Sequence, residues 1–212
     1  WNAEGLMAST AGVNYTYDGD GRRVKKDSGK LYWYSGGQVI AESDGSGNLT
    51  SEYIFFGGMR IARRDVSSGN VFYFVSDRLG NTAVMTNATG GIVEESAFYP
   101  FGAERTITDT LDNNYKFTGH ERDTESSLDH TPFRQYSCNT GHWLSPDRIH
   151  GKARNPQSWN RYAYVRNSPN NAIDPDGAST YWCTQILDED FQPIGIDCQC
   201  ISGCTSLDSQ EE

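Results

Sequence analysis

The chain reads Tyr15-Thr16-Tyr17-Asp18-Gly19-Asp20-Gly21-Arg22-Arg23-Val24 at residues 15–24. Two short runs that favour extended backbone flank an Asp/Gly turn, which is the pattern of a β-hairpin. Weaker echoes of this pattern occur at 39–49 and at 84–93. A motif that recurs in this way predicts a fold built from repeated hairpins.

Turn residues recur at a spacing of roughly ten residues, which predicts one continuous antiparallel sheet. The composition of 12 Tyr, 9 Phe, 5 Trp and 22 Gly agrees, because aromatic residues favour strands and glycines favour tight turns. We therefore expect an all-β protein. The predicted hairpins pair 8–17 with 22–34, 37–43 with 49–56, 59–66 with 71–76, and 82–87 with 92–99.

Three segments carry more specific expectations. Residues 53–57 place bulky side chains on both faces of a strand, which predicts that the strand is covered on both sides. Residues 103–114 are polar and are expected to form a loop. Residues 155–160 are expected to start a short helix, with Asn155 as its cap and Pro156 at its first position.

The formal net charge is −10. Nucleic acid or an anionic membrane would need a basic face, so we expect neither as a partner. No run approaches the roughly 18 apolar residues of a membrane-spanning helix. We expect no cofactor and no metal, because the four histidines lack the spacing of metal ligands. They are His120, His130, His142 and His150.

Two aspartates stand beside prolines near the end of the chain. Asp147 closes Ser145-Pro146-Asp147, and Asp174 opens Asp174-Pro175-Asp176-Gly177. Each motif alone is typical of a turn. Two carboxyl groups brought together can instead share a proton and act as acid and base on an amide. The residues alone leave both interpretations open.

The five cysteines are divided between the body and the tail of the chain. Cys138 stands apart, whereas Cys183, Cys198, Cys200 and Cys204 cluster near the end. We expect two disulfides among these four, with three possible connectivities. A four-thiolate zinc site and free thiols are the alternatives, although the spacing lacks the usual Cys-x2-Cys pairs. Disulfides would imply an oxidising location, secreted or at the cell surface.

Four further motifs follow one another in fixed order. They are Phe117-Thr118-Gly119-His120-Glu121-Arg122-Asp123, Trp143-Leu144-Ser145-Pro146-Asp147, Asn160-Arg161-Tyr162-Ala163-Tyr164-Val165 and Asp174-Pro175-x-Gly177. Together with the repeats upstream, they resemble the Rhs / YD-repeat family. The resemblance divides the chain into a YD-repeat β-sheet at 1–114, an Rhs repeat-associated core at 115–177 and a variable, cysteine-rich tail at 178–212.

The resemblance also implies a mechanism. In Rhs-like proteins the repeat sheet curls into a shell, the core plugs it, and the enclosed C-terminal segment, often a toxin, is released by self-cleavage. Asp147 and Asp174 would be the catalytic pair, and the cut would fall between Ala178 and Ser179. One carboxylate would activate water while the other, protonated, polarises the carbonyl. Ala178 replaces the family's leucine, which removes about 2 kcal/mol of apolar burial, so we expect an uncut or inefficiently cut chain. Arg148 is expected to be a solvated charge.

The ends of the chain suggest an alternative function. Residues 1–6 resemble the middle of a repeat, so we expect a piece of a longer protein with an open sheet edge. In the tail, 180–187 and 191–200 are expected to pair as strands. A structural extracellular module could then self-assemble into a filament by strand addition. The expected partners are upstream repeats or identical subunits, and the chain's own tail; a carbohydrate-binding module has only the aromatic residues in its favour.

Overall fold

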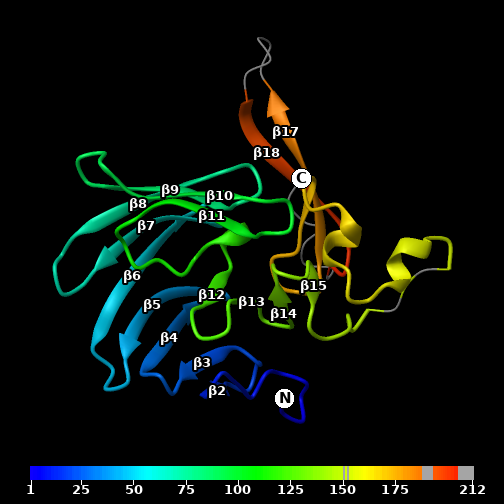
Figure 1. Cartoon of the computed structure of the whole chain (residues 1–212), viewed down its shortest axis with the longest axis horizontal. Coiled ribbons are helices and arrows are strands. Elements are labelled where there is room, and N and C mark those ends of the chain that lie inside the picture. Colours follow the sequence, from blue (N-terminus) through cyan, green and yellow to red (C-terminus); the bar gives the residue numbers. More distant parts are fainter. Residues whose placement is uncertain (150, 152, 188–192, 205–212) are drawn as a thin grey trace.

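The computed structural model describes residues 1–149, 151, 153–187 and 193–204. Its described strands form three antiparallel sheets, which confirms the all-β prediction. Figure 1 shows the largest sheet curving around the second one, while the third extends away from both. The largest sheet contains β1 (Ser9–Thr10), β2 (Val13–Tyr17), β3 (Arg23–Lys26), β4 (Lys30–Ser35), β5 (Gln38–Asp44), β6 (Leu49–Phe56), β7 (Met59–Asp65), β8 (Val71–Ser76), β9 (Thr82–Asn87), β10 (Ile92–Phe98) and β11 (Glu104–Asp109).

The two smaller sheets follow in the sequence, together with short 3-10 helices. The second sheet contains β12 (Glu121–Asp123), β13 (Leu128–His130), β14 (Gln135–Ser137) and β15 (His142–Trp143). The third contains β16 (Ala172–Ile173), β17 (Thr180–Leu187) and β18 (Pro193–Ser202). The 3-10 helices are η1 (Phe117–Gly119), η2 (Pro156–Trp159) and η3 (Tyr164–Asn167).

The strands of the large sheet pair in sequence order from β1 to β11, as expected for consecutive hairpins. Four of the turns use the same device: a side-chain oxygen accepts hydrogen bonds from the backbone N–H groups two and four residues later, at Asp18, Asp44, Asp77 and Asn87. These local bonds replace ladder bonds and set each reversal of direction. Among the described strands β1 and β11 do not pair with each other, so the curved sheet is open (Figure 1).

Some strand boundaries differ from the prediction. The expected strand 8–17 is interrupted at Ala11, which has φ 48°, and 22–34 is interrupted by a tight turn before Lys30. The expected loop 103–114 contains β11, which pairs with β10 from Phe98↔Glu104 to Glu94↔Asp109. Helix η2 does begin at Pro156, but Asn155 makes no side-chain cap bond.

The prediction that 53–57 is covered on both faces is wrong. Tyr53 faces inward and is 8% exposed, whereas Ile54 and Phe56 on the other face are 53% and 76% exposed. The curved sheet therefore buries only its concave face. The bulky residues of the opposite face are left in contact with solvent.

The second sheet carries the aromatic core. The ring of Tyr136 packs against Phe117 from η1, against Trp143 and against Tyr164 from η3, and Trp143 also packs against Tyr164. All four side chains are at most 2% exposed. Gly102 adopts φ +86°, and a Cβ atom there would lie 2.6 Å from the Phe117 ring. The motif residues that carry the family resemblance thus form the centre of the fold.

A buried ion cluster joins the large sheet to this core; we call it the sheet–core cluster. Arg23 of β3 pairs with Asp123 at 2.7 Å and with Glu121 at 2.8 Å, and all three side chains are at most 5% exposed. Tyr32 donates a hydrogen bond to Glu121 at 2.8 Å. The charged members are Arg23, Lys26, Lys30, Glu42, Glu121, Asp123 and Glu125.

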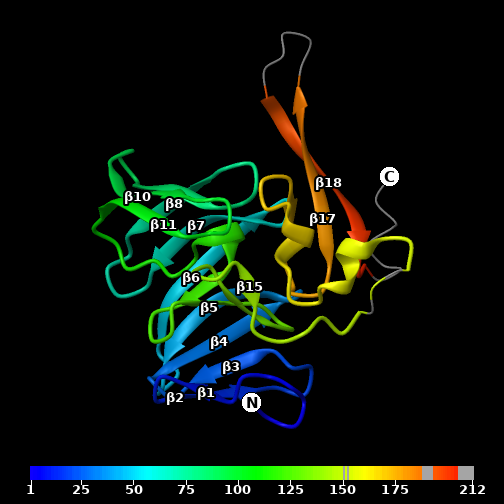
Figure 2. The ribbon, with the colours of Figure 1, turned by 45° about the vertical axis from the view of Figure 1, so that its right-hand side comes forward.

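The tail forms a hairpin that continues from the core. β17 pairs with β16 through Ala172↔Trp182 and Ile173↔Tyr181, and with β18 along its length. Figure 2 shows this hairpin extending away from the other sheets. The expected return strand 191–200 corresponds to β18, whose described part begins at Pro193 and continues to Ser202; residues 191 and 192 lie outside the described residues. Within the described residues, no helix has the length and apolar character needed to cross a membrane.

Candidate functional site

The segment around Asp147 is held by the motif at 160–165. Trp143 and Asp147 donate backbone hydrogen bonds to Tyr162 and Arg161, respectively, at 2.9 Å. The Arg161 guanidinium in turn donates to the carbonyl oxygen of Asp147. Because Tyr164 is fixed in the aromatic core, this pairing fixes the position of Asp147 relative to the core.

Asp174 lies in the turn that leads into the tail. Its side chain is 1% exposed, and Oδ1 accepts hydrogen bonds from the backbone N–H groups of Gly177 at 2.8 Å and Ser179 at 3.2 Å. Gly177 has φ +83°, and a Cβ atom there would overlap Thr131. The turn predicted from the sequence is therefore present, and its carboxyl group is buried inside it.

One arginine joins the two aspartates. Nη2 of Arg134 lies 3.1 Å from Oδ2 of Asp147 and 3.0 Å from Oδ2 of Asp174. Arg134 is 4% exposed and lies over the ring of Trp143. It also donates to the carbonyl oxygen of Gly177. The structure thus brings Asp147 and Asp174 to one site, with a cation between them that the sequence did not indicate.

The electrostatics of the site favour a protonated Asp174. Burial raises the pKa of Asp174 to about 8, Arg134 opposes this effect, and the neighbouring charge of Asp176 adds to it. Repulsion between the paired carboxylates of Asp147 and Asp174 would predict a raised pKa for one of them. The acid whose charge contributes to the raised pKa of Asp174 is instead Asp176. Arg148 is exposed and lies over the ring of Phe133, as a solvated charge would.

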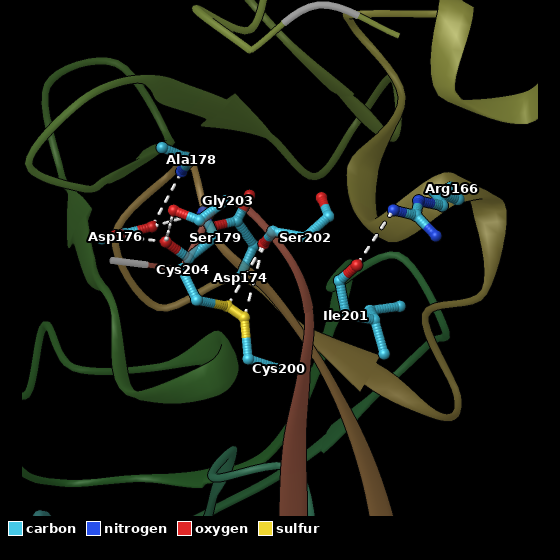
Figure 3. The surroundings of a disulfide bond; sticks show 10 residues. All are labelled: Arg166, Asp174, Asp176, Ala178, Ser179, Cys200, Ile201, Ser202, Gly203 and Cys204. Atoms are coloured by element: carbon cyan, nitrogen blue, oxygen red, sulfur yellow. Dashed lines mark hydrogen bonds between the residues drawn. A yellow bond between two sulfur atoms is a disulfide. The ribbon is translucent and has the colours of Figure 1, made fainter. Parts of the chain in front are cut away.

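The proposed cleavage junction lies against these acids. Asp176 Oδ1 accepts hydrogen bonds from the N–H groups of Ala178 at 2.8 Å and Ser179 at 2.7 Å, and Oδ2 accepts one from the Ser179 hydroxyl at 2.9 Å. Figure 3 shows these bonds together with Gly203 on the other side of the junction. A Cβ atom at Gly203 would overlap the carbonyl oxygen of Ala178. The junction is therefore clamped between the Asp174 turn and the end of β18.

The cysteine prediction is confirmed, and the structure selects one connectivity. Cys183 is bonded to Cys198 across β17 and β18, and Cys200 is bonded to Cys204 beside the junction (Figure 3). Cys138 is a buried free thiol in the aromatic core.

The described histidines do not form a metal site. Thr118 contacts His120, Gln135 contacts His130, and Thr140 contacts His142, while His150 lies outside the described residues. In the described part of the chain, no three His, Cys, Asp or Glu side chains are arranged to hold a metal ion.

A cavity of about 700 Å³ lies under the concave face of the large sheet, and its lining includes Ile173 and Pro175, the two sequence neighbours of Asp174. Its walls include Phe74 and Tyr115 from the body of the protein and Ile196 and Cys198 from β18. Two residues of the tail hairpin thus contribute to the wall of this cavity, while the rest of the hairpin extends away from the sheets (Figure 2).

No family model matches the chain. Over 187 residues it is 27% identical to the tRNA nuclease WapA of Bacillus subtilis (strain 168), a match that covers 84% of this chain and 8% of that protein. Over 190 residues it is 27% identical to teneurin-4 of Homo sapiens, covering 80% of this chain and 7% of that protein.

Solved structures share the fold. A TcdB2-TccC3-Cdc42 crystal structure matches with a TM-score of 0.64 and 22% identity, and the Photorhabdus luminescens Tc holotoxin pore matches with a TM-score of 0.60 and 22% identity. Each match covers 84% of this chain and 10% of the other. These proteins are of the YD-repeat or Rhs type, which supports the predicted family. The chain spans no more than a tenth of any of them, and the assignment of 115–177 to the core domain stays a prediction.

Proposed function

We propose that the chain is the C-terminal part of an Rhs / YD-repeat shell protein that encloses its variable tail and cleaves itself after Ala178. In this proposal residues 1–114 form the wall, 115–177 form the core that carries the acids, and 178–212 are the enclosed segment. The similarity to YD-repeat proteins and the curved sheet, whose cavity is lined in part by Ile196 and Cys198 of the tail, support this arrangement. Two disulfides in the tail favour an extracellular destination.

The observation that carries the proposal is the position of Asp174 at the junction. Its buried carboxyl group bonds to the N–H of Gly177 and to the N–H of Ser179, on either side of Ala178. The acid is thus already in place beside the bond to be cut. Because substrate and catalyst belong to one chain, proximity is supplied by folding rather than by a binding pocket.

The two aspartates suit different roles in this reaction. Asp174, with its pKa raised to about 8 by burial, holds a proton at neutral pH and can give it to the departing nitrogen of Ser179. Asp147 has a side chain that is 22% exposed and can reach water. We assign Asp147 as the base that activates the hydrolytic water.

Intact-mass spectrometry of the 212-residue chain tests this function. We expect a product that ends at Ala178, and no product from Asp147→Asn or Asp174→Asn. Asp44→Asn is a matched control, because Asp44 also accepts turn hydrogen bonds but lies in an exposed hairpin. An intact mass that persists in the unmodified protein at neutral pH would contradict the proposal.

A structural role is the second candidate, and the exposed tail hairpin favours it. Ile186 and Leu187, at the end of β17, are 44% and 45% exposed, and Ile196 of β18 is 38% exposed. An apolar hairpin of this kind can add to the open edge of a neighbouring sheet. Electron microscopy separates the two ideas: filaments that shorten on reduction would support assembly, and isolated particles would oppose it.

A further inference from the structure

Ser179 stands directly after the proposed cut, and its side chain has no role in the mechanism proposed above. The residue is 5% exposed, and its hydroxyl donates to Oδ2 of Asp176 at 2.9 Å. We propose that Ser179 Oγ, with Asp176 as its base, attacks the carbonyl carbon of Ala178, so that cleavage proceeds through an N-to-O acyl shift. This inference rests on the proposed function and names the nucleophile of its first step.

The position of the hydroxyl makes the attack intramolecular. A serine hydroxyl reaches the preceding carbonyl carbon through a five-membered ring, so no diffusing nucleophile is needed. Most serines do not react in this way because they lack an adjacent base and a fixed peptide. Ser179 has both: Asp176 contacts its hydroxyl, and Asp174 and Asp176 hold its N–H.

The opposite side of the junction is also fixed. Oγ of Ser179 lies 3.2 Å from the carbonyl oxygen of Gly203, and the backbone of Gly203 packs against the Ala178 carbonyl so closely that a side chain would not fit. The Cys200–Cys204 disulfide closes the loop that carries Gly203 (Figure 3). The peptide to be opened therefore has little freedom to turn away from the hydroxyl.

The reaction balances with groups at the site and one water molecule. The Ser179 hydroxyl gives its proton to Asp176 as Oγ bonds to the Ala178 carbonyl carbon. The C–N bond breaks, Asp174 protonates the departing nitrogen, and an ester joins Ala178 to Oγ. Water then adds to the ester and gives a proton to Asp147, the C–Oγ bond breaks, and Oγ recovers its proton from Asp176. The products are a carboxyl group at Ala178 and a free amine at Ser179.

The test compares Ser179→Ala, Ser179→Cys and Asp176→Asn with Thr180→Ala, a matched control at the next buried hydroxyl. We expect Ser179→Ala and Asp176→Asn to slow cleavage by at least about 100-fold, and Thr180→Ala to cleave normally. Neutral hydroxylamine is the trapping probe. It should convert the ester of the unmodified protein, and the thioester of Ser179→Cys, into a hydroxamate at Ala178 that mass spectrometry identifies.

The outcomes separate this inference from the proposed function. Normal cleavage of Ser179→Ala, with no hydroxamate from the unmodified protein, would overturn the acyl shift and leave aspartate-dependent hydrolysis in place. If the unmodified protein neither cleaves nor yields a hydroxamate, both proposals fail. Circular dichroism of each variant would show whether lost cleavage reflects lost folding, and restored trapping in Ser179→Cys would exclude that explanation.

Discussion

Two groups of buried charges use the same residue types to opposite effect. In the sheet–core cluster, burial raises the pKa of Glu121, but Arg23, Lys30 and Lys26 outweigh it and hold that pKa below its usual range. At the junction, Arg134 contacts both Asp147 and Asp174, and the pKa of Asp174 rises to about 8. The balance of cations to carboxylates decides the result, since burial acts in the same direction in both.

The number of cations around a buried acid thus decides whether the acid stabilises the fold or can transfer a proton. Glu121 is paired with three cations, Arg23, Lys26 and Lys30, which keep it charged and hold the sheet against the core. An acid with fewer cation partners, such as Asp174 beside Arg134, keeps a proton in the folded protein, where it is available for transfer. The following changes challenge this distinction.

The largest effect is expected for Arg23→Met. Asp123 and Glu121 would remain buried without their main cation, which should lower the free energy of unfolding by about 3–5 kcal/mol. Chemical denaturation measures this loss. Arg22→Met is the matched control, since Arg22 is the adjacent residue but pairs with Asp18 and Asp20 at the surface, and its midpoint should barely move. Equal losses in the two variants would contradict the structural role of the sheet–core cluster.

Asp174→Asn should change the pH dependence of stability. The native Asp174 keeps its proton up to about pH 8, whereas the unfolded chain loses it near 3.8, so this group lowers the free energy of unfolding as pH rises between those values. The buried His120, with its pKa lowered to about 4, acts in the opposite sense below pH 6.5.

The window from pH 6.5 to 8 therefore isolates Asp174. Across it, the unmodified protein should lose about 2 kcal/mol relative to Asp174→Asn. Denaturation curves measured at several pH values for both proteins give this difference. Parallel stability profiles would mean that Asp174 titrates normally.

Arg134→Met should move the same titration further. Arg134 opposes the effect of burial, so its removal should raise the pKa of Asp174 above about 8, by about one to two units. Carboxyl carbon NMR of the labelled protein follows this shift. An unchanged pKa would show that the guanidinium does not act on Asp174.

Arg148→Met should have the smallest effect. The side chain is exposed and makes no ion pair with Asp147 or Asp174 among the described contacts, so stability should change by less than about 0.5 kcal/mol. The pKa of Asp174 should stay the same in the NMR titration. A shift as large as that of Arg134→Met would move the cation assignment from Arg134 to Arg148.

Sequence patterns predicted the repeated hairpins because their signals are local. Each Asp or Asn that bonds to its own turn can be recognised within five residues, as at Asp44. β11 was missed because its sequence is polar and most of its residues are exposed, so it lacks the alternation of a half-buried strand. Backbone pairing with β10 stabilises this strand, although its composition does not favour one.

The candidate site was predictable only in part. Asp147 and Asp174 were identified from motifs, but Arg134 lies 40 residues from Asp174 in a segment with no pattern of its own. Only the pairing of β14 and β15 and the turn at Gly177 bring its guanidinium to the acids. Asp176 was visible as a turn residue, yet its contact with the Ser179 hydroxyl depends on the folded turn.

The pairing of β17 with β16 makes a cut and a release two separate events. After a cut at 178–179, Trp182 would still pair with Ala172, and the backbone N–H of Cys183 would still donate a hydrogen bond to the carbonyl oxygen of Asn171. The nicked halves would migrate separately on a denaturing gel yet elute together from a sizing column. Release of the tail would then require a force, or local unfolding, that separates β17 from β16.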